Sequence, residues 1–391
     1  MKPSRQFRPS LDHSESLEDR KLLSTLKPFY SQRLPIYQPL ETQTLPTPTI
    51  PRFQLQSTRV YELLPPPGQT NPVSVSDYKV GGVTIVPFGY PYAAAHPGMT
   101  LVSLSSNPDG GGGPPSEVIS VGTLGERQSF YQSSPSEMIL TNPAMFRSGF
   151  VTVGVTPTTY DPATTITSSS PGELRVLNRV GQPVMIISDP NLISGPSAFA
   201  WLDRGNSASL FVANSINGTV SRFDFRIFQR GLGAIRLQRS TLIGAGFSTA
   251  GSATTNLQGP SGLSYDDKTD TLYVASTLDN AVYAIDRASR VRNVGTTGRL
   301  IFNNSAWLSN PAGVTLSPSR TLLVTGDLIS GGTGMAEFDL RGQYIANVAT
   351  GTAASGAGSI TWNHSLYGFG PEVVTLNGND KTIQFFPLNF N

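Results

Sequence analysis

Short apolar runs separated by polar turns predict β-strands over much of the chain. In one stretch, four runs follow one another at 262–265, 271–276, 281–287 and 291–294, the last as a ragged outer strand. Because side chains alternate along a strand, Leu272 and Val274 face one side and Tyr273 and Ala275 face the other. Both sets are apolar, so this strand is expected to pack against a neighbouring sheet on each face.

The same stretch recurs along the sequence. Three copies begin at Gly195-Pro196-Ser197, Gly259-Pro260-Ser261 and Asn310-Pro311-Ala312. Three further units can be aligned at 99–121, 149–177 and 372–386. A supersecondary unit that recurs in this way indicates a repeat architecture. The sequence therefore predicts an all-β fold, a β-propeller of about six four-stranded blades.

Proline and glycine divide the chain into two parts. Residues 1–70 are rich in proline, which favours extended chain, so we predict an N-terminal linker there and the propeller at 71–391. Within the first part, residues 52–64 contain Phe53, Leu55, Val60, Tyr61 and Leu63, and an alternative is that some of them form a strand that helps to close the ring. The 39 Gly and 31 Pro of the whole chain suit many turns and few long helices.

The net charge and the numbers of cysteine and histidine residues exclude several classes of function. Charged residues make up 14% of the chain, and a net charge of +2 leaves no strong field for nucleic acid or anionic lipid. Cysteine is absent, and only His13, His96 and His364 are available, so neither a multi-histidine metal site nor a cofactor is predicted. No apolar run is long enough to span a membrane, and the first 30 residues lack the apolar core of an ordinary secretory signal.

Loop lengths point to one face of the predicted ring. In a propeller, the loops between second and third strands share a face with the connections from blade to blade. Long connections at 107–115, 155–171 and 327–333 are expected on this loop-rich face. Polar side chains near the central channel that could bind a ligand there are Asn214, Asn217, Thr277, Asp279, Asn280 and Asp327. Asn and Asp also dominate tight turns for backbone reasons, so a purely structural role stays open.

Three aspartates recur at the ends of third strands. Asp224, Asp286 and Asp339 close that strand in successive copies. Because a carboxylate at this position commonly accepts hydrogen bonds from turn amides, we interpret all three as structural.

The repeated unit resembles a known class of repeat. The segments Gly259–Asp266, Thr271–Ser276 and Asn280-Ala281-Val282 are similar to NHL and YVTN β-propeller repeats, strongly over residues 195–345. This resemblance implies a propeller more firmly than any activity. Some similar propellers are metal-dependent lactonases whose repeats carry asparagine and aspartate where this chain has Ser261 and Ser276, a departure that argues against that chemistry.

A short segment near the N-terminus suggests export. Residues Ser16–Ser24 resemble the LEPR-XLL segment of large exported planctomycete proteins, with Asp19 in place of the usual proline. The resemblance implies a secreted or cell-surface protein.

The sequence favours a non-enzymatic propeller that binds a protein, glycan or surface partner through the loop-rich face. The first alternative is a propeller enzyme, a metal-dependent hydrolase similar to the lactonases or a lyase. The second is a structural module of a cell envelope.

Overall fold

The computed structural model describes residues 57, 59–63, 78–86, 98–106, 115–122, 124–133, 138–161, 166–228, 234–251, 258–293, 295–351, 357–363, 372–378 and 381–388. These residues form 26 β-strands and no α-helix. The described residues all belong to one compact unit, Pro48–Asn391. The export-like segment, most of the proline-rich segment and the predicted boundary at residues 70 and 71 lie outside the described residues.

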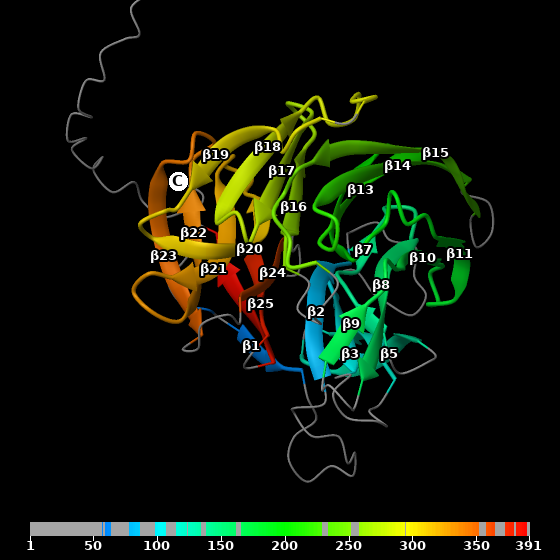
Figure 1. Cartoon of the computed structure of the whole chain (residues 1–391). Helices are drawn as coiled ribbons and strands as arrows, with labels where there is room; N and C mark the ends of the chain where they lie inside the picture. Colours follow the sequence, from blue (N-terminus) through cyan, green and yellow to red (C-terminus); the bar gives the residue numbers. More distant parts are fainter. Residues whose placement is uncertain are drawn as a thin grey trace, which may run out of the picture. The chain divides into compact units, whose positions relative to one another are not determined.

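The first three sheets follow chain order (Figure 1). The first contains β2 (Tyr78–Ile85), β3 (Thr100–Ser106), β4 (Glu117–Val121) and β5 (Arg127–Gln132). The second contains β6 (Met138–Leu140), β7 (Ala144–Met145), β8 (Val151–Asp161), β9 (Ile166–Ser169), β10 (Glu173–Leu177) and β11 (Pro183–Ile187). The third contains β12 (Pro196–Asp203), β13 (Ser207–Asn214), β14 (Thr219–Phe228) and β15 (Ala234–Ala245).

Three more sheets complete the set, and strand pairing is antiparallel throughout. The fourth contains β16 (Pro260–Asp266), β17 (Thr271–Ser276), β18 (Ala281–Asp286) and β19 (Arg299–Asn303). The fifth contains β20 (Leu308–Leu316), β21 (Leu322–Leu328), β22 (Thr333–Phe338) and β23 (Tyr344–Gly351). The sixth contains β24 (Ala357–Asn363), β25 (Glu372–Asn377), β26 (Thr382–Pro387) and, at its outer edge, β1 (Arg59–Glu62).

The six sheets surround a common axis. Along the inner side, β2 contacts β24, β24 contacts β20, β20 contacts β16 and β16 contacts β12. The ring closes because β12 also contacts β8, and β7 of the same second sheet contacts β2. In Figure 1 these strands lie around the centre, with β11, β15, β19 and β23 at the rim. The predicted all-β propeller of about six four-stranded blades is confirmed: there are six blades with four strands in a row, and in the second blade β7 and β9 pair with β8 in addition.

The core lies between the blades. The described residues contain six apolar clusters, and each fills the space between one pair of neighbouring sheets. Val274 belongs to the cluster between the third and fourth sheets, while Tyr273 belongs to the cluster between the fourth and fifth. The alternation read from 271–276 is therefore confirmed, with one apolar set on each face of β17.

The repeated Gly-Pro-Ser and Asn-Pro segments join neighbouring blades. Proline begins β12 and β16 and lies within β20. The proline carbonyl accepts a hydrogen bond from a hydroxyl of the preceding blade: Ser197 Oγ donates to the Pro260 carbonyl at 2.7 Å. Thr277 Oγ1 likewise donates to Pro311 at 3.0 Å. Next to Pro260, the strands approach so closely that a Cβ on Gly262 would lie 2.7 Å from a Cα of β20. The sequence repeat thus encodes the contact between blades.

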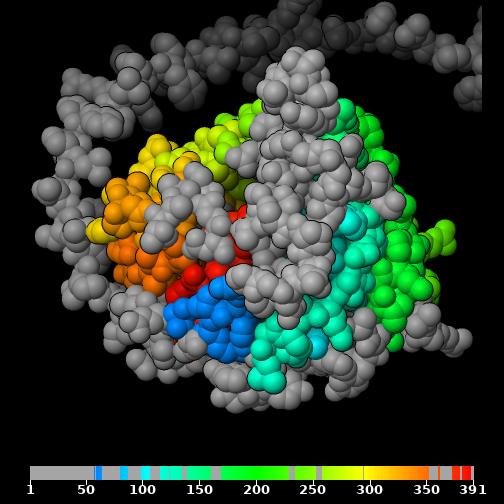
Figure 2. Space-filling model, turned by 90° about the horizontal axis from the view of Figure 1, so that it is seen from below, coloured from blue at the N-terminus to red at the C-terminus, as the bar shows by residue number. Residues whose placement is uncertain are grey.

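Strand β1 closes the ring by joining the sixth sheet to the first. Its four residues pair antiparallel with β26. Tyr61 packs against the turn between β4 and β5 of the first sheet. Its ring is so near Gly125 in this turn that a Cβ added to the glycine would lie 3.2 Å from it. Figure 2 shows this blue strand between the red C-terminal residues and the cyan-green residues of the first sheet. The predicted closing strand within 52–64 is confirmed for residues 59–62.

The prediction of an outer strand at 291–294 is wrong. The outer strand of the fourth sheet is β19, and residues 287–290 form a turn. This segment leaves the sheet because Arg222 Nη1 donates to the carbonyls of Ala288 and Val291, at 2.8 and 3.1 Å. These bonds fix the segment against the third sheet. Val294 itself lies outside the described residues.

Two of the three expected long loops differ from the prediction. The connection at 155–171 is largely a paired hairpin, because β8 continues to Asp161 and returns as β9. The connection at 327–333 is short, since β21 ends at Leu328 and β22 begins at Thr333. Residues 107–114 of the remaining loop lie outside the described residues.

Candidate functional site

The loop-rich face is defined here by three turns, 215–218, 277–280 and 329–332, which join second to third strands in the third, fourth and fifth sheets. The hairpin of β8 and β9 occupies the same position in the second sheet. All six predicted ligand residues lie in these turns or at the strand ends beside them.

Asn214 and Asn217 stabilise the first of these turns. Asn214 is buried, its Oδ1 accepts from the Ser194 N–H at 3.0 Å, and its Nδ2 donates to the Leu192 carbonyl at 3.0 Å. Asn217 is exposed and its Oδ1 accepts from Thr219 Oγ1 at 2.7 Å. These contacts give Asn214 a structural role, and ligand binding by either residue stays a prediction.

Thr277 and Asp279 also make contacts that stabilise the fold. Thr277 donates to the carbonyl of Pro311 in the next blade. Asp279 accepts from Ser276 Oγ at 2.6 Å and from the Ser248 N–H at 3.2 Å. The turn between β17 and β18 is thereby tied to the third and fifth sheets.

A polar bridge of Asn280, Asn304, Asn310 and Asp327 joins the fourth and fifth sheets. Asn280 Nδ2 donates to Asn304 Oδ1 at 3.1 Å, and Asn280 Oδ1 accepts from the Asn310 N–H at 2.9 Å. Asn310 Nδ2 then donates to Asp327 Oδ2 at 2.9 Å. Asn280 and Asn310 have φ values of 49° and 50°, a left-handed conformation that asparagine tolerates. The predicted ligand residues Asn280 and Asp327 are therefore brought together, because both side chains accept hydrogen bonds from Asn310.

Three exposed apolar residues accompany the polar bridge, and we call Leu278, Trp307 and Ile329 the apolar rim. Their exposed fractions are 41%, 37% and 58%. The Ile329 N–H donates to the Trp307 carbonyl at 3.2 Å, and the Trp307 ring stacks on Tyr344 with centroids 4.1 Å apart. Leu278 and Ile329 were not among the residues predicted from the sequence. The available signal was a leucine at 278 inside an otherwise polar turn.

The axis of the ring contains a cavity of about 170 Å³. Its described lining comes from the innermost strands of five sheets and from residues 142–144 of the second sheet, and it carries hydroxyl, amide and apolar side chains but no charged one. The polar and aromatic lining residues include Thr84, Asn142, Trp201, Ser264, Tyr265 and Thr315. Such a lining can accept or donate hydrogen bonds, but among the described residues it offers no carboxylate for acid–base chemistry.

A metal centre is not built by the part of the chain that the structure describes. There, no group of three or more His, Cys, Asp or Glu side chains is placed to hold an ion. His13, His96 and His364 lie outside the described residues. The described residues also contain no helix of the length and hydrophobicity needed to cross a membrane.

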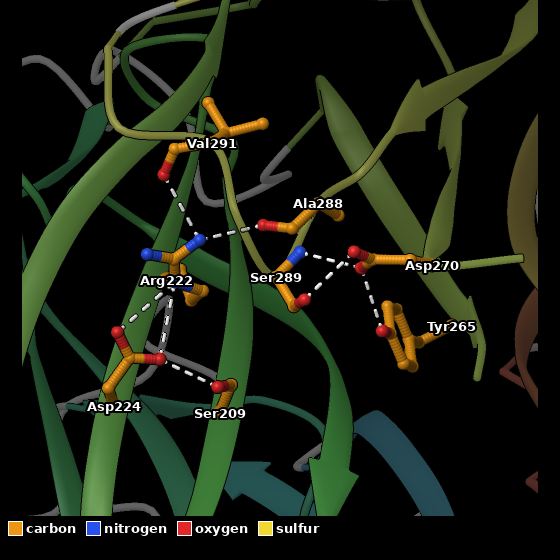
Figure 3. A network of polar contacts seen from close by, with 8 residues as sticks. All are labelled: Ser209, Arg222, Asp224, Tyr265, Asp270, Ala288, Ser289 and Val291. Carbon is orange, nitrogen blue, oxygen red and sulfur yellow. Dashed lines mark hydrogen bonds and ion pairs between the residues drawn. The ribbon is translucent and has the colours of Figure 1, made fainter.

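A polar network on the face opposite the loop-rich one connects the third and fourth sheets (Figure 3). Buried Arg222 pairs with Asp224, Nε to Oδ1 at 3.2 Å, and Asp224 accepts from Ser209 Oγ at 2.6 Å. Asp270 accepts from Tyr265 Oη at 2.8 Å and from the Ser289 N–H at 2.8 Å. Burial, followed by the hydrogen bond to Asp270, raises the pKa of Tyr265, so the phenol remains a donor. This network anchors the turn that replaced the expected outer strand.

An ion pair connects the fourth and fifth sheets nearby. Arg320 Nη2 lies 2.6 Å from Asp266 Oδ2, and Asp266 also accepts from Thr269 Oγ1 at 2.6 Å. Burial alone would raise the pKa of Asp266, but the hydrogen bonds from Thr269 and Arg320 outweigh it and the pKa is lowered. The carboxylate is thus held in its charged form.

The three aspartates interpreted as structural behave differently. Asp339 Oδ1 accepts from the N–H groups of Arg341 and Gln343 at 2.8 Å each, as predicted. Asp224 pairs with Arg222, and exposed Asp286 lies 3.8 Å from the guanidinium of Arg299. These carboxylates are used within the fold.

No protein-family model matches the chain, and no curated protein matches it in sequence. Among solved structures, a protein of unknown function from Bacteroides thetaiotaomicron is 14% identical with a TM-score of 0.46, covering 80% of this chain and 70% of that one. A luciferin-regenerating enzyme is 11% identical with a TM-score of 0.43, covering 80% and 91%. Regucalcin from Agrobacterium tumefaciens, a calcium-binding protein, is 12% identical with a TM-score of 0.35, covering 60% and 66%. At these values no functional conclusion follows for this chain.

Proposed function

We propose that this protein is a non-enzymatic propeller that binds a partner through its loop-rich face, and that the apolar rim makes the central contacts. The observation that carries the proposal is the exposure of Leu278, Trp307 and Ile329 in adjoining turns that are held together by hydrogen bonds. Exposed apolar side chains on a rigid support are typical of interaction sites. A protein partner suits this surface better than a small polar ligand, because the amides of the polar bridge already bond to one another.

The hairpin of β8 and β9 supports the same proposal. β8 pairs with β10 only as far as Val155 and then continues to Asp161, paired with β9. The hairpin therefore adds an ordered arm to the second sheet on the loop-rich face, in the manner of functional loops on a rigid scaffold. Export to the cell surface, implied by residues 16–24, would place this face where extracellular partners are available.

The test is capture by the immobilised full chain, with bound proteins identified and quantified by mass spectrometry. We expect Leu278→Ser combined with Ile329→Ser to abolish capture of a specific partner while the protein stays folded. The matched control is Val184→Ser combined with Ile186→Ser, which removes apolar side chains 49% and 57% exposed on the outer strand β11. A partner that binds both double variants equally contradicts the role of the apolar rim.

A further inference from the structure

The charges of this chain are unevenly distributed. Between Pro196 and Ala245, the span of the third sheet, the sequence contains six arginines, two aspartates and no lysine or glutamate. This one sheet is therefore more basic than the chain as a whole, which has a net charge of +2. The low net charge argues against binding of polyanions by the molecule as a whole. It does not argue against binding of polyanions by this more basic sheet.

Three of these arginines lie close together on one sheet face, and we call Arg226, Arg236 and Arg239 the arginine face. Arg226 on β14 lies directly opposite Arg236 on β15. Two residues earlier on β14, Asp224 lies opposite Arg239. Residues two apart on a strand share a face, so Arg222, Asp224 and Arg226 point to the same side of β14. Figure 3 shows Arg222 directed toward the turn of the fourth sheet, and Asp224 directed toward Arg222 and Ser209.

The arginine face is exposed. Arg226, Arg236 and Arg239 form no salt bridge with any residue that the structure describes, whereas nearby Asp224 is already paired with Arg222. The Arg226 guanidinium lies 5.7 Å from the ring of Phe228. Like charges directly opposite each other on a sheet are destabilising. The repulsion between Arg226 and Arg236 therefore lowers the stability of the fold, and a bound anion would offset this repulsion.

The neighbouring blade carries two further arginines near Arg222. The fourth-sheet turn held by Arg222 carries Arg287 and Arg290, which line an open groove beside it together with Asp286 and Val291. The Arg290 side chain is 80% exposed and only weakly engaged with Asp270, Nε to Oδ2 at 3.4 Å. Arg287 and Arg290 therefore lie next to Ala288 and Val291, the residues that accept hydrogen bonds from buried Arg222.

The structure favours one kind of anionic partner. An acidic peptide that added a strand to β15 would need a regular edge, but the pairing of β14 with β15 shifts register twice, between Val220 and Ser221 and between Asp224 and Phe225. Single-stranded nucleic acid is bound on arrays of aromatic side chains, and Phe228 is the exposed aromatic that the described part of this face provides. Guanidinium groups beside the exposed hydroxyl of Ser207 instead suit a partner that presents carboxylates and hydroxyls from a flexible chain.

We propose that the arginine face binds an acidic polysaccharide, with Arg226 and Arg236 together holding one carboxylate. The site lies on the third sheet, away from the apolar rim, so it stands or falls independently of the proposed partner of the loop-rich face. It also gives a cell-surface protein a second attachment point of different chemistry.

The test measures binding of polygalacturonate to the full chain by isothermal titration calorimetry at low and moderate salt. We expect binding that weakens as salt rises, because exposed charge pairs are screened. Arg226→Gln combined with Arg236→Gln should weaken binding at least about tenfold, the effect of losing a bidentate carboxylate contact. The matched control is Arg147→Gln combined with Arg341→Gln, which removes two exposed arginines from the second and fifth sheets and should change the affinity less than about twofold.

Three results would overturn the proposal. One is the absence of polygalacturonate binding at low salt, and another is an equal loss of affinity in the control variant. The third is tighter binding of poly-L-glutamate or of a thymidine oligonucleotide than of polygalacturonate, which would assign the face to an acidic protein or to nucleic acid. Thermal denaturation of each variant shows whether a loss of binding reflects loss of the fold.

Discussion

The guanidinium carbon of Arg59 lies 4.2 Å from the centroid of the Phe385 ring. The same guanidinium forms a salt bridge with Glu372, whose side chain is buried. Arg59 belongs to β1 at the start of the described chain, whereas Phe385 and Glu372 belong to strands near its end. These contacts hold β1 to the C-terminal strands of the sixth sheet, between residues more than three hundred positions apart, so the two ends of the propeller share one blade.

Removing this closure should destabilise the whole propeller. We expect Arg59→Ala to lower the free energy of unfolding by about 3–5 kcal/mol, because it leaves the Glu372 carboxylate buried without its guanidinium. Thermal or urea denaturation measures the effect, with exposed Arg341→Ala as the control. Equal stability of the two variants would show that β1 is dispensable for closure.

A charge placed between blades should be far more damaging than one placed on a turn. Val274 is fully buried in the cluster between the third and fourth sheets, so Val274→Asp should cost several kcal/mol, a large part of a domain's margin of roughly 5–15 kcal/mol. Leu278→Asp introduces the same side chain four residues later on an exposed turn and should change stability little. Soluble yield and denaturation midpoints of the two variants give the comparison, and similar losses would contradict the strand register.

The pKa of Asp266 predicts how stability depends on acid pH. Because its folded pKa is lowered, the unfolded state binds more protons as the pH falls, and stability decreases once the pH drops below the ordinary pKa of about 4. Asp266→Asn should lower the free energy of unfolding at pH 7 by about 1.5–3 kcal/mol and make its decrease toward pH 2 shallower. Urea denaturation from pH 2 to 7 tests this.

Arg222 should be required for the ordered turn of the fourth sheet. Lysine keeps the charge but cannot at once reach Asp224 and both carbonyls of the turn, so we expect Arg222→Lys to increase hydrogen exchange at residues 288–291 by about tenfold or more. Exchange in β17, measured on the same sample, serves as an internal reference. Unchanged exchange in the turn would mean that contacts with Asp270 suffice to hold it.

Much of the fold could be predicted from the sequence because the repeat encodes contacts between blades. The prolines at 260 and 311 accept hydroxyls from the preceding blade, and the two apolar sets of 271–276 fill two different clusters. The outer strand of the fourth sheet was misplaced because its position depends on Arg222, which lies in a different blade. Contacts with another blade outweighed the local apolar pattern of this segment.

The candidate site was less predictable. The six polar residues do lie at the loop-rich face, but their partners, such as Asn304 for Asn280 or Ser248 for Asp279, come from other turns and cannot be read from spacing. Leu278 and Ile329 of the apolar rim were not predicted, because a single leucine or isoleucine in a turn has no periodic pattern. The pairing of Arg226 with Arg236 depends on strand register across a connection of uncertain length in the sequence.

The most direct test of the account is the affinity of the captured partner for a chain whose β8 and β9 hairpin has been shortened. Residues 158–169 can be replaced by a short Gly-Ser turn, because the Ser170 N–H already meets the Pro157 carbonyl at 2.9 Å. If the loop-rich face is the binding surface, the melting temperature should change by less than a few degrees while the affinity falls at least about tenfold. Full affinity in the shortened chain, together with turnover of lactone or ester substrates that a chelator abolishes, would contradict the binding account and establish the enzyme.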